Sequence, residues 1–113
     1  MNKVEEKIAL YKQEIKTHGI TLKNEKLLEK VTKGLGPSIH NNDASKVSTT
    51  DPEEVARVKK NFLIGKLGLK DSPALDEAIL EVSKMFGSSN KNKHRAIFYT
   101  LLVEKFKKES IYK

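Results

Sequence analysis

Apolar side chains recur along the chain at the spacing of amphipathic α-helices. The first such stripe falls at i, i+4, i+7 and i+11 and consists of Val4, Ile8, Tyr11 and Ile15. This spacing places all four side chains on one face of a helix. Gly19 follows and can adopt the left-handed conformation that ends a helix, with Ile20 folding back on Ile15. We therefore predict a first helix that ends at Gly19.

A shorter second helix is predicted over Glu25–Lys33. Its buried face is supplied by Leu27, Leu28 and Val31, and Gly34 is its predicted stop. The segment Gly36–Thr50 then consists mostly of turn-forming and small polar residues. We expect one long irregular loop there, and its length makes it a candidate functional loop.

The strongest helix start in the sequence is Asp51-Pro52-Glu53-Glu54. Asp51 is the predicted N-cap, Pro52 suits the first helical position, and Glu54 can reach back to complete a capping box. The apolar face continues to Leu67, and Gly68 is the predicted stop. Gly65 lies inside this helix at a cost of about 1 kcal/mol relative to alanine, which suggests a close approach by another helix.

Two further helices complete the predicted fold. Ser72-Pro73 repeats the start signal for a helix that runs to Phe86 and ends at Gly87. The last helix is predicted over Ser88–Lys108, and its half Ile97–Phe106 is apolar on so many sides that it should be central. No segment alternates with period two, so strands are not required. The sequence predicts an all-α, single-domain multihelical array of about five helices over residues 1–113.

Composition narrows the class of protein. The chain has 113 residues and no cysteine, which excludes disulfides, thiolate catalysis and cysteine-ligated zinc. No apolar run approaches the roughly 20 residues that cross a bilayer. The N-terminus carries charges of both signs and no apolar core of a signal peptide. We expect a cytoplasmic protein with no membrane partner.

Positive charge is concentrated near the C-terminus. The net charge is +7, of which residues 88–113 supply +5. The candidate site for nucleic acid or another polyanion is the predicted start of the last helix: Asn90, Lys91, Asn92, Lys93 and Arg95. These side chains suit base edges and phosphates, and they precede the one acceptable recognition helix of a helix–turn–helix arrangement. The alternative is that the cations are solvated or that Arg95 pairs with a carboxylate of a neighbouring helix.

Several short motifs resemble a small uncharacterised bacterial family, catalogued as domain of unknown function 2853. They are Lys33-Gly-Leu-Gly-Pro-Ser-Ile39, Asp51-Pro-Glu-Glu54, Asn61-Phe-Leu63, Lys66-Leu-Gly-Leu69, Ala74-Leu-Asp76, and Asn90-Lys-Asn-Lys93 with Arg95. The resemblance spans almost the whole chain. It implies an all-helical fold and transfers no activity or site residues.

Catalytic and metal-binding patterns are weak. The three histidines, His18, His40 and His94, are far apart and form no helical pair, so no metal site is predicted. Ser38, His40 and Asp43 lie too close together on one loop to converge as a triad. Gly34-Leu-Gly36-Pro37 follows a helix and lacks the third glycine of a nucleotide-binding loop. We predict no enzyme activity and no cofactor.

The sequence therefore favours a non-catalytic binding module for a polyanion. The competing hypothesis is a structural or homo-oligomeric protein. It would use apolar residues left over near the C-terminus for self-association, namely Tyr99, Val103, Ile111 and Tyr112.

Overall fold

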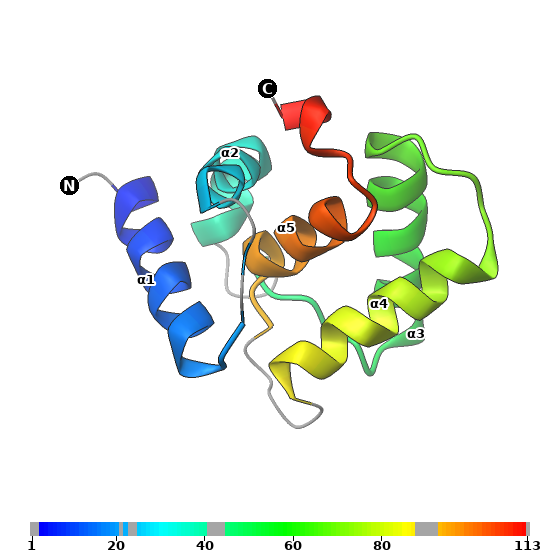
Figure 1. Ribbon diagram of the computed structural model, residues 1–113, viewed down its shortest axis with the longest axis horizontal. Helices are drawn as coiled ribbons and strands as arrows, with labels where there is room; N and C mark the ends of the chain where they lie inside the picture. Colours follow the sequence, from blue (N-terminus) through cyan, green and yellow to red (C-terminus); the bar gives the residue numbers. More distant parts are fainter. Residues whose placement is uncertain (1–2, 21, 23–24, 41–44, 88–92, 113) are drawn as a thin grey trace.

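The computed structural model describes residues 3–20, 22, 25–40, 45–87 and 93–112 (Figure 1). Its elements, in chain order, are α1 (Lys3–Thr17), α2 (Glu25–Leu35), the 3₁₀-helix η1 (Gly36–His40), α3 (Pro52–Arg57), the π-helix η2 (Val58–Lys66), α4 (Pro73–Phe86), α5 (Arg95–Lys105) and the 3₁₀-helix η3 (Glu109–Tyr112). No strand occurs within these ranges. The predicted all-α multihelical fold is confirmed.

Helix α5 lies at the centre of the molecule, as its apolar pattern predicted. Every residue from Ala96 to Glu104 is buried. Helices α1, α2 and α4 all pack against α5, and Figure 1 shows α5 between α1 and α2 on one side and η2 and α4 on the other. The buried cluster draws side chains from each of these elements. The core is therefore organised around one helix with no free face.

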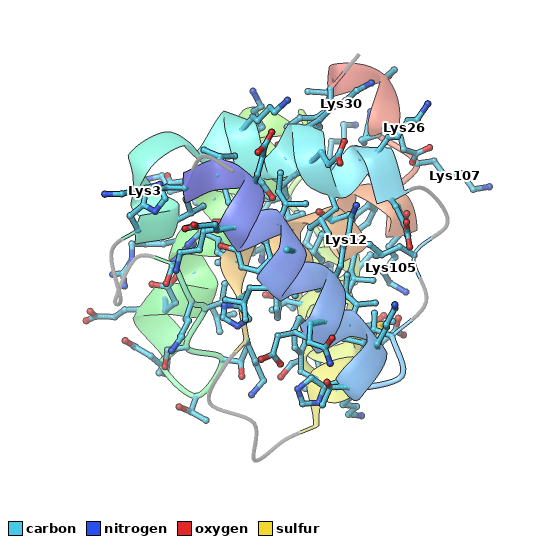
Figure 2. The ribbon with its side chains drawn as sticks, turned by 90° about the vertical axis from the view of Figure 1, so that its left-hand side faces the viewer. Lys3, Lys12, Lys26, Lys30, Lys105 and Lys107 are labelled. Carbon is cyan, nitrogen blue, oxygen red and sulfur yellow. The ribbon has the colours of Figure 1, made fainter. Side chains whose placement is uncertain are left out.

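Helices α1 and α2 cover one side of α5 and pack against each other (Figure 2). The end of α1 follows the prediction: Gly19 has a φ of +65°, and the amide of Ile20 donates to the carbonyl of Ile15 at 2.9 Å. The predicted end of α2 was wrong. Gly34 lies inside the helix, and Gly36 takes the positive φ at its end. None of the described helices has both the length and the apolar composition needed to span a bilayer.

Helix α3 begins as predicted, with the Asp51 side chain accepting from the amide of Glu53 at 2.9 Å. It continues directly into η2, where the hydrogen-bonding pattern widens. The amide of Leu67 bonds the carbonyl of Phe62, five residues earlier, at 2.9 Å. Buried residues follow the same wider period, at Val58, Phe62, Leu63 and Leu67. Spacings of four and five keep these side chains on the core, whereas a 3.6-residue turn would rotate them away.

Gly65 fits this wider helix for a reason different from the one predicted. A Cβ added at Gly65 would lie 3.2 Å from the carbonyl oxygen of Lys60, five residues earlier in the same helix. The expectation of a close approach by another helix was therefore wrong. The crowding comes from the π-helical turn itself.

The irregular segment after η1 is tied to the start of α5. The amide of Val47 donates to the carbonyl of Lys93 at 2.8 Å, and the amide of Arg95 donates to the carbonyl of Ser45 at 2.7 Å. These bonds flank an antiparallel bridge between Lys46 and His94. Lys93 and His94 are therefore non-helical, and α5 begins at Arg95. The predicted start at Ser88 lies outside the described residues, as do Asn41 to Ala44.

Replacing Gly65 by alanine distinguishes a π-helix from an α-helix by the sign of the effect. A Gly→Ala change inside an exposed α-helix raises stability by up to about 1 kcal/mol. In η2 the added methyl group crowds the Lys60 carbonyl. We therefore expect Gly65→Ala to lower the free energy of unfolding by about 1 kcal/mol, measured by urea denaturation.

Gly34→Ala is the matched control for this measurement. Gly34 is exposed inside α2, and the nearest neighbour of an added Cβ is a Tyr112 ring carbon at 3.4 Å. Its substitution should therefore raise stability. Equal gains at both glycines would contradict the π-helical geometry.

Candidate functional site: the start of helix α5

The residues proposed from the sequence fall into two groups in the structure. Asn90, Lys91 and Asn92 lie outside the described residues. Lys93 is only 4% exposed, and burial lowers the pKa of its ammonium group. Arg95 opens α5 and is mostly buried, with 16% of its side chain exposed. The two described cations therefore face the protein interior.

The Arg95 guanidinium joins three elements. Its Nη2 donates to Glu54 Oε1 of α3 at 2.6 Å and to the Lys46 carbonyl at 3.3 Å. Its Nη1 donates to the Tyr99 hydroxyl, one turn further along α5, at 2.6 Å. The alternative in which Arg95 pairs with a carboxylate of a neighbouring helix is thus confirmed. A buried cation requires such partners, because an unpaired one is very costly to remove from water.

The Glu54 carboxylate accepts hydrogen bonds from two arginines. While Oε1 accepts from Arg95, Oε2 accepts from Arg57 Nη2 at 2.8 Å. Burial alone would raise the pKa of this carboxyl, but the hydrogen bonds from Arg57 and Arg95 outweigh burial and lower it. The predicted capping box is therefore not formed, and the Asp51 amide bonds the Ser48 carbonyl at 3.3 Å instead. Sequence reasoning missed this role because a glutamate at this position also suits a capping box.

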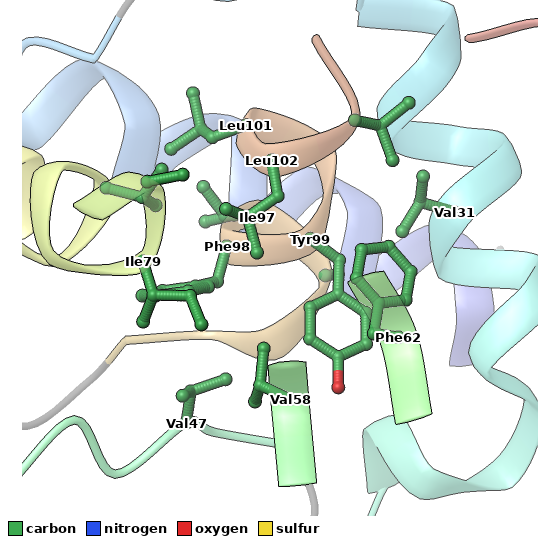
Figure 3. Packing of buried hydrophobic residues seen from close by; sticks show 14 of the residues in the cluster. Val31, Val47, Val58, Phe62, Ile79, Ile97, Phe98, Tyr99, Leu101 and Leu102 are labelled. Atoms are coloured by element: carbon green, nitrogen blue, oxygen red, sulfur yellow. The ribbon is translucent and has the colours of Figure 1, made fainter. Parts of the chain in front are cut away.

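Tyr99 carries the network into the apolar core. Its ring stacks on Phe62 of η2, with centroids 3.8 Å apart and planes inclined by 17° (Figure 3). Burial raises the pKa of the Tyr99 hydroxyl, and the nearby Arg95 offsets this only in part. The phenol therefore stays neutral at physiological pH and accepts the guanidinium hydrogen bond. One chain of contacts links Glu54, Arg95, Tyr99 and Phe62.

The recognition-helix interpretation does not agree with this geometry. A recognition helix presents side chains of its first turns to the major groove. The first turns of α5 are occupied by buried Ala96 and Ile97, while Arg95 is held by Glu54. Helix α5 therefore has no exposed face that could enter a groove.

A second contact fixes α1 against the start of α5. The rings of Tyr11 and His94 lie 5.2 Å apart, and Tyr11 is fully buried. The Tyr11 hydroxyl has no hydrogen-bond partner among the described residues. Burial lowers the pKa of His94, Glu14 of α1 acts in the opposite direction, and the nearby basic side chains of Lys46, Lys7 and His18 lower it further. The imidazole is therefore held neutral in the folded protein.

The other chemical candidates remain separate. In the ranges that the structure describes, no group of three or more histidine, aspartate or glutamate side chains is placed to hold a metal ion. His40 is exposed at the end of η1, and Asp43 lies outside the described residues. His18 contacts Glu14 at 3.2 Å near the end of α1, as expected for a histidine at a helix C-terminus.

The low pKa of His94 makes stability depend on pH in a defined direction. The unfolded chain binds a proton at a pKa near 6.5, and the folded protein does so only at a lower pH. The stabilisation is thus complete above pH 6.5 and is lost as the pH falls below it. We expect the free energy of unfolding to decrease between pH 7.5 and 5.5, by at most about 1.4 kcal/mol per pH unit.

Urea unfolding at a series of pH values measures this dependence. His94→Gln should flatten the curve in that window, whereas His40→Gln, at an exposed position, should leave it unchanged. A wild-type curve that is already flat, or one that His94→Gln does not alter, would show that His94 is not the responsible group.

Comparison with known proteins agrees with the resemblance noted in the sequence. A family profile described as "Protein of unknown function (DUF2853)" matches residues 10–110. No curated protein matches the chain. Because the match covers nearly the whole sequence, the chain belongs to the DUF2853 family, whose function is unknown.

Proposed function

We propose that this protein is a non-catalytic binding module for polyanions such as nucleic acid. The observation that carries the proposal is a row of exposed lysines on α2, Lys26, Lys30 and Lys33, at i, i+4 and i+7. This spacing places all three ammonium groups on one face of the helix. The opposite face of α2, with Leu27, Leu28 and Val31, is buried in the core. We call this row the α2 lysine row.

Other lysines surround the row. Figure 2 shows Lys26 and Lys30 on the same side of the molecule as Lys12 of α1, and as Lys105 and Lys107 at the end of α5. Two of these neighbours are already paired: Lys12 contacts Glu29 at 3.7 Å, and Lys105 bonds Glu81. Lys30, Lys33 and Lys107 are exposed and form no ion pair with any described residue.

The chemistry of the row suits phosphate groups better than base edges. Lysine is a compact, strongly hydrated point charge, while arginine provides the planar fork that reads guanine. Both arginines of the chain, Arg57 and Arg95, are bound to Glu54. We therefore propose contacts with the backbone of the polyanion and binding that depends little on sequence.

Buried Lys93 and paired Arg95 are not needed for this function. Asn90, Lys91 and Asn92 remain candidates on the sequence alone. The proposed ligand is still a polyanion, as the charge distribution indicated, but the main contact surface is the α2 lysine row.

Salt-dependent binding tests the α2 lysine row. The probe is a fluorescently labelled 20-base-pair DNA duplex of mixed sequence, titrated at several salt concentrations. We expect affinity to fall steeply with salt, because each lysine–phosphate contact releases a counterion. In Lys30→Gln/Lys33→Gln, the slope of log affinity against log salt should decrease by about two, since about 0.9 is lost per contact.

Lys60→Gln/Lys70→Gln is the matched control. It also removes two exposed lysines, so the two double variants have the same net charge. It should retain most of the wild-type slope. Lys91→Gln, in the same assay, measures the contribution of the segment before α5. Equal losses in the two double variants, or no wild-type binding at about 50 mM salt, would contradict the proposal.

A further inference from the structure

Helix α4 presents an outer face that no described element covers. Its inner face, which includes Leu75, Ile79 and Val82, packs in the core. On the outer face Leu80 is 56% exposed, the highest value among the exposed large hydrophobic residues of the described chain, which are Leu10, Leu80, Met85 and Ile111. A single exposed leucine is ordinary for a soluble protein. The charged side chains around Leu80, however, indicate what this face could contact.

Four charged side chains flank Leu80 on α4, and two of them are already used within the chain. Asp76 bonds Lys59 Nζ at 3.0 Å, and Glu81 bonds Lys105. The other two, Glu77 and Lys84, are exposed and form no ion pair with any described residue. Glu77 precedes Leu80 by three positions and Lys84 follows it by four, so both lie one turn from Leu80 on the same face.

This arrangement is complementary to itself in the antiparallel direction. A two-fold axis beside Leu80 reverses the direction of the helix. It therefore brings the two copies of Leu80 together and sets Glu77 of each copy opposite Lys84 of the other. Such an interface is isologous, with the same patch on both subunits, and it closes at a dimer. The leucine contact is enclosed by two identical ion pairs.

We propose that helix α4 pairs with helix α4 of a second copy through Glu77, Leu80 and Lys84. The surface differs from the one expected from the sequence. Tyr99 and Val103 are buried in the core, and Tyr112 packs against it. Of the four apolar residues expected from the sequence to support self-association, only Ile111 is exposed. A single helix face is smaller than a standard protein interface, so the dimer should be weak, with a dissociation constant on the order of 100 µM.

Charge reversal tests this pairing with its own internal controls. Sedimentation equilibrium is measured from about 5 to 500 µM, a range that brackets a dissociation constant of this order. Wild-type mass should rise toward the dimer with concentration. Glu77→Lys sets a lysine opposite Lys84 of the partner at both symmetric contacts, and Lys84→Glu sets a glutamate opposite Glu77 at both, so each variant alone should stay monomeric. Circular dichroism confirms that the variants are folded.

Complementation then identifies the contact. An equimolar mixture of Glu77→Lys and Lys84→Glu should form a mixed dimer, and the double variant Glu77→Lys/Lys84→Glu should regain self-association. Leu80→Ala should lose it, while Leu10→Ala, at another exposed leucine, should not. A wild type that is monomeric at every concentration overturns the proposal. So do single variants that still dimerise, or a mixture that stays monomeric.

Discussion

A cation in the interior constrains most of this fold. The Arg95 guanidinium is mostly buried, and a buried charge is tolerated only where partners replace its water. Glu54, the Tyr99 hydroxyl and the Lys46 carbonyl supply those partners from α3, α5 and the segment after η1. Each partner must therefore be held in place by its own element. Phe62 of η2 extends the same chain of contacts into the core by stacking on Tyr99.

The described positive side chains differ in burial and in whether they form an ion pair. Lys93 is buried, and Arg95 is mostly buried and organises the start of α5. Lys30, Lys33 and Lys107 are exposed and form no ion pair with any described residue. Helix α5 cannot itself be the binding element, because its residues from Ala96 to Glu104 are buried. A polyanion-binding surface on α2 and a self-complementary face on α4 would leave the central helix to its structural role.

Much of the fold could be predicted from local signals. The helix start at Asp51-Pro52, the stop at Gly19 and the central position of Ile97–Phe106 follow from capping, positive φ and apolar periodicity. The π-helix was missed although the four- and five-residue spacing of Val58, Phe62 and Leu67 is visible in the sequence. The partner of Arg95 was not identifiable, because Glu54 lies 41 positions away and also suits a capping box. The late start of α5 likewise depends on a distant pairing with Ser45 and Val47.

Two arginines that share one carboxylate can show whether the buried Arg95 ion pair organises the fold. Double-mutant cycles with Glu54→Gln, Arg95→Met and Arg57→Met measure each coupling energy by urea unfolding. Arg95 is mostly buried, whereas the Arg57 side chain is 56% exposed. If the buried ion pair organises the fold, the Glu54–Arg95 coupling should exceed about 1.5 kcal/mol, and the Glu54–Arg57 coupling should be clearly smaller. Two couplings of equal, small size would contradict the claim that the buried Arg95 ion pair organises the fold.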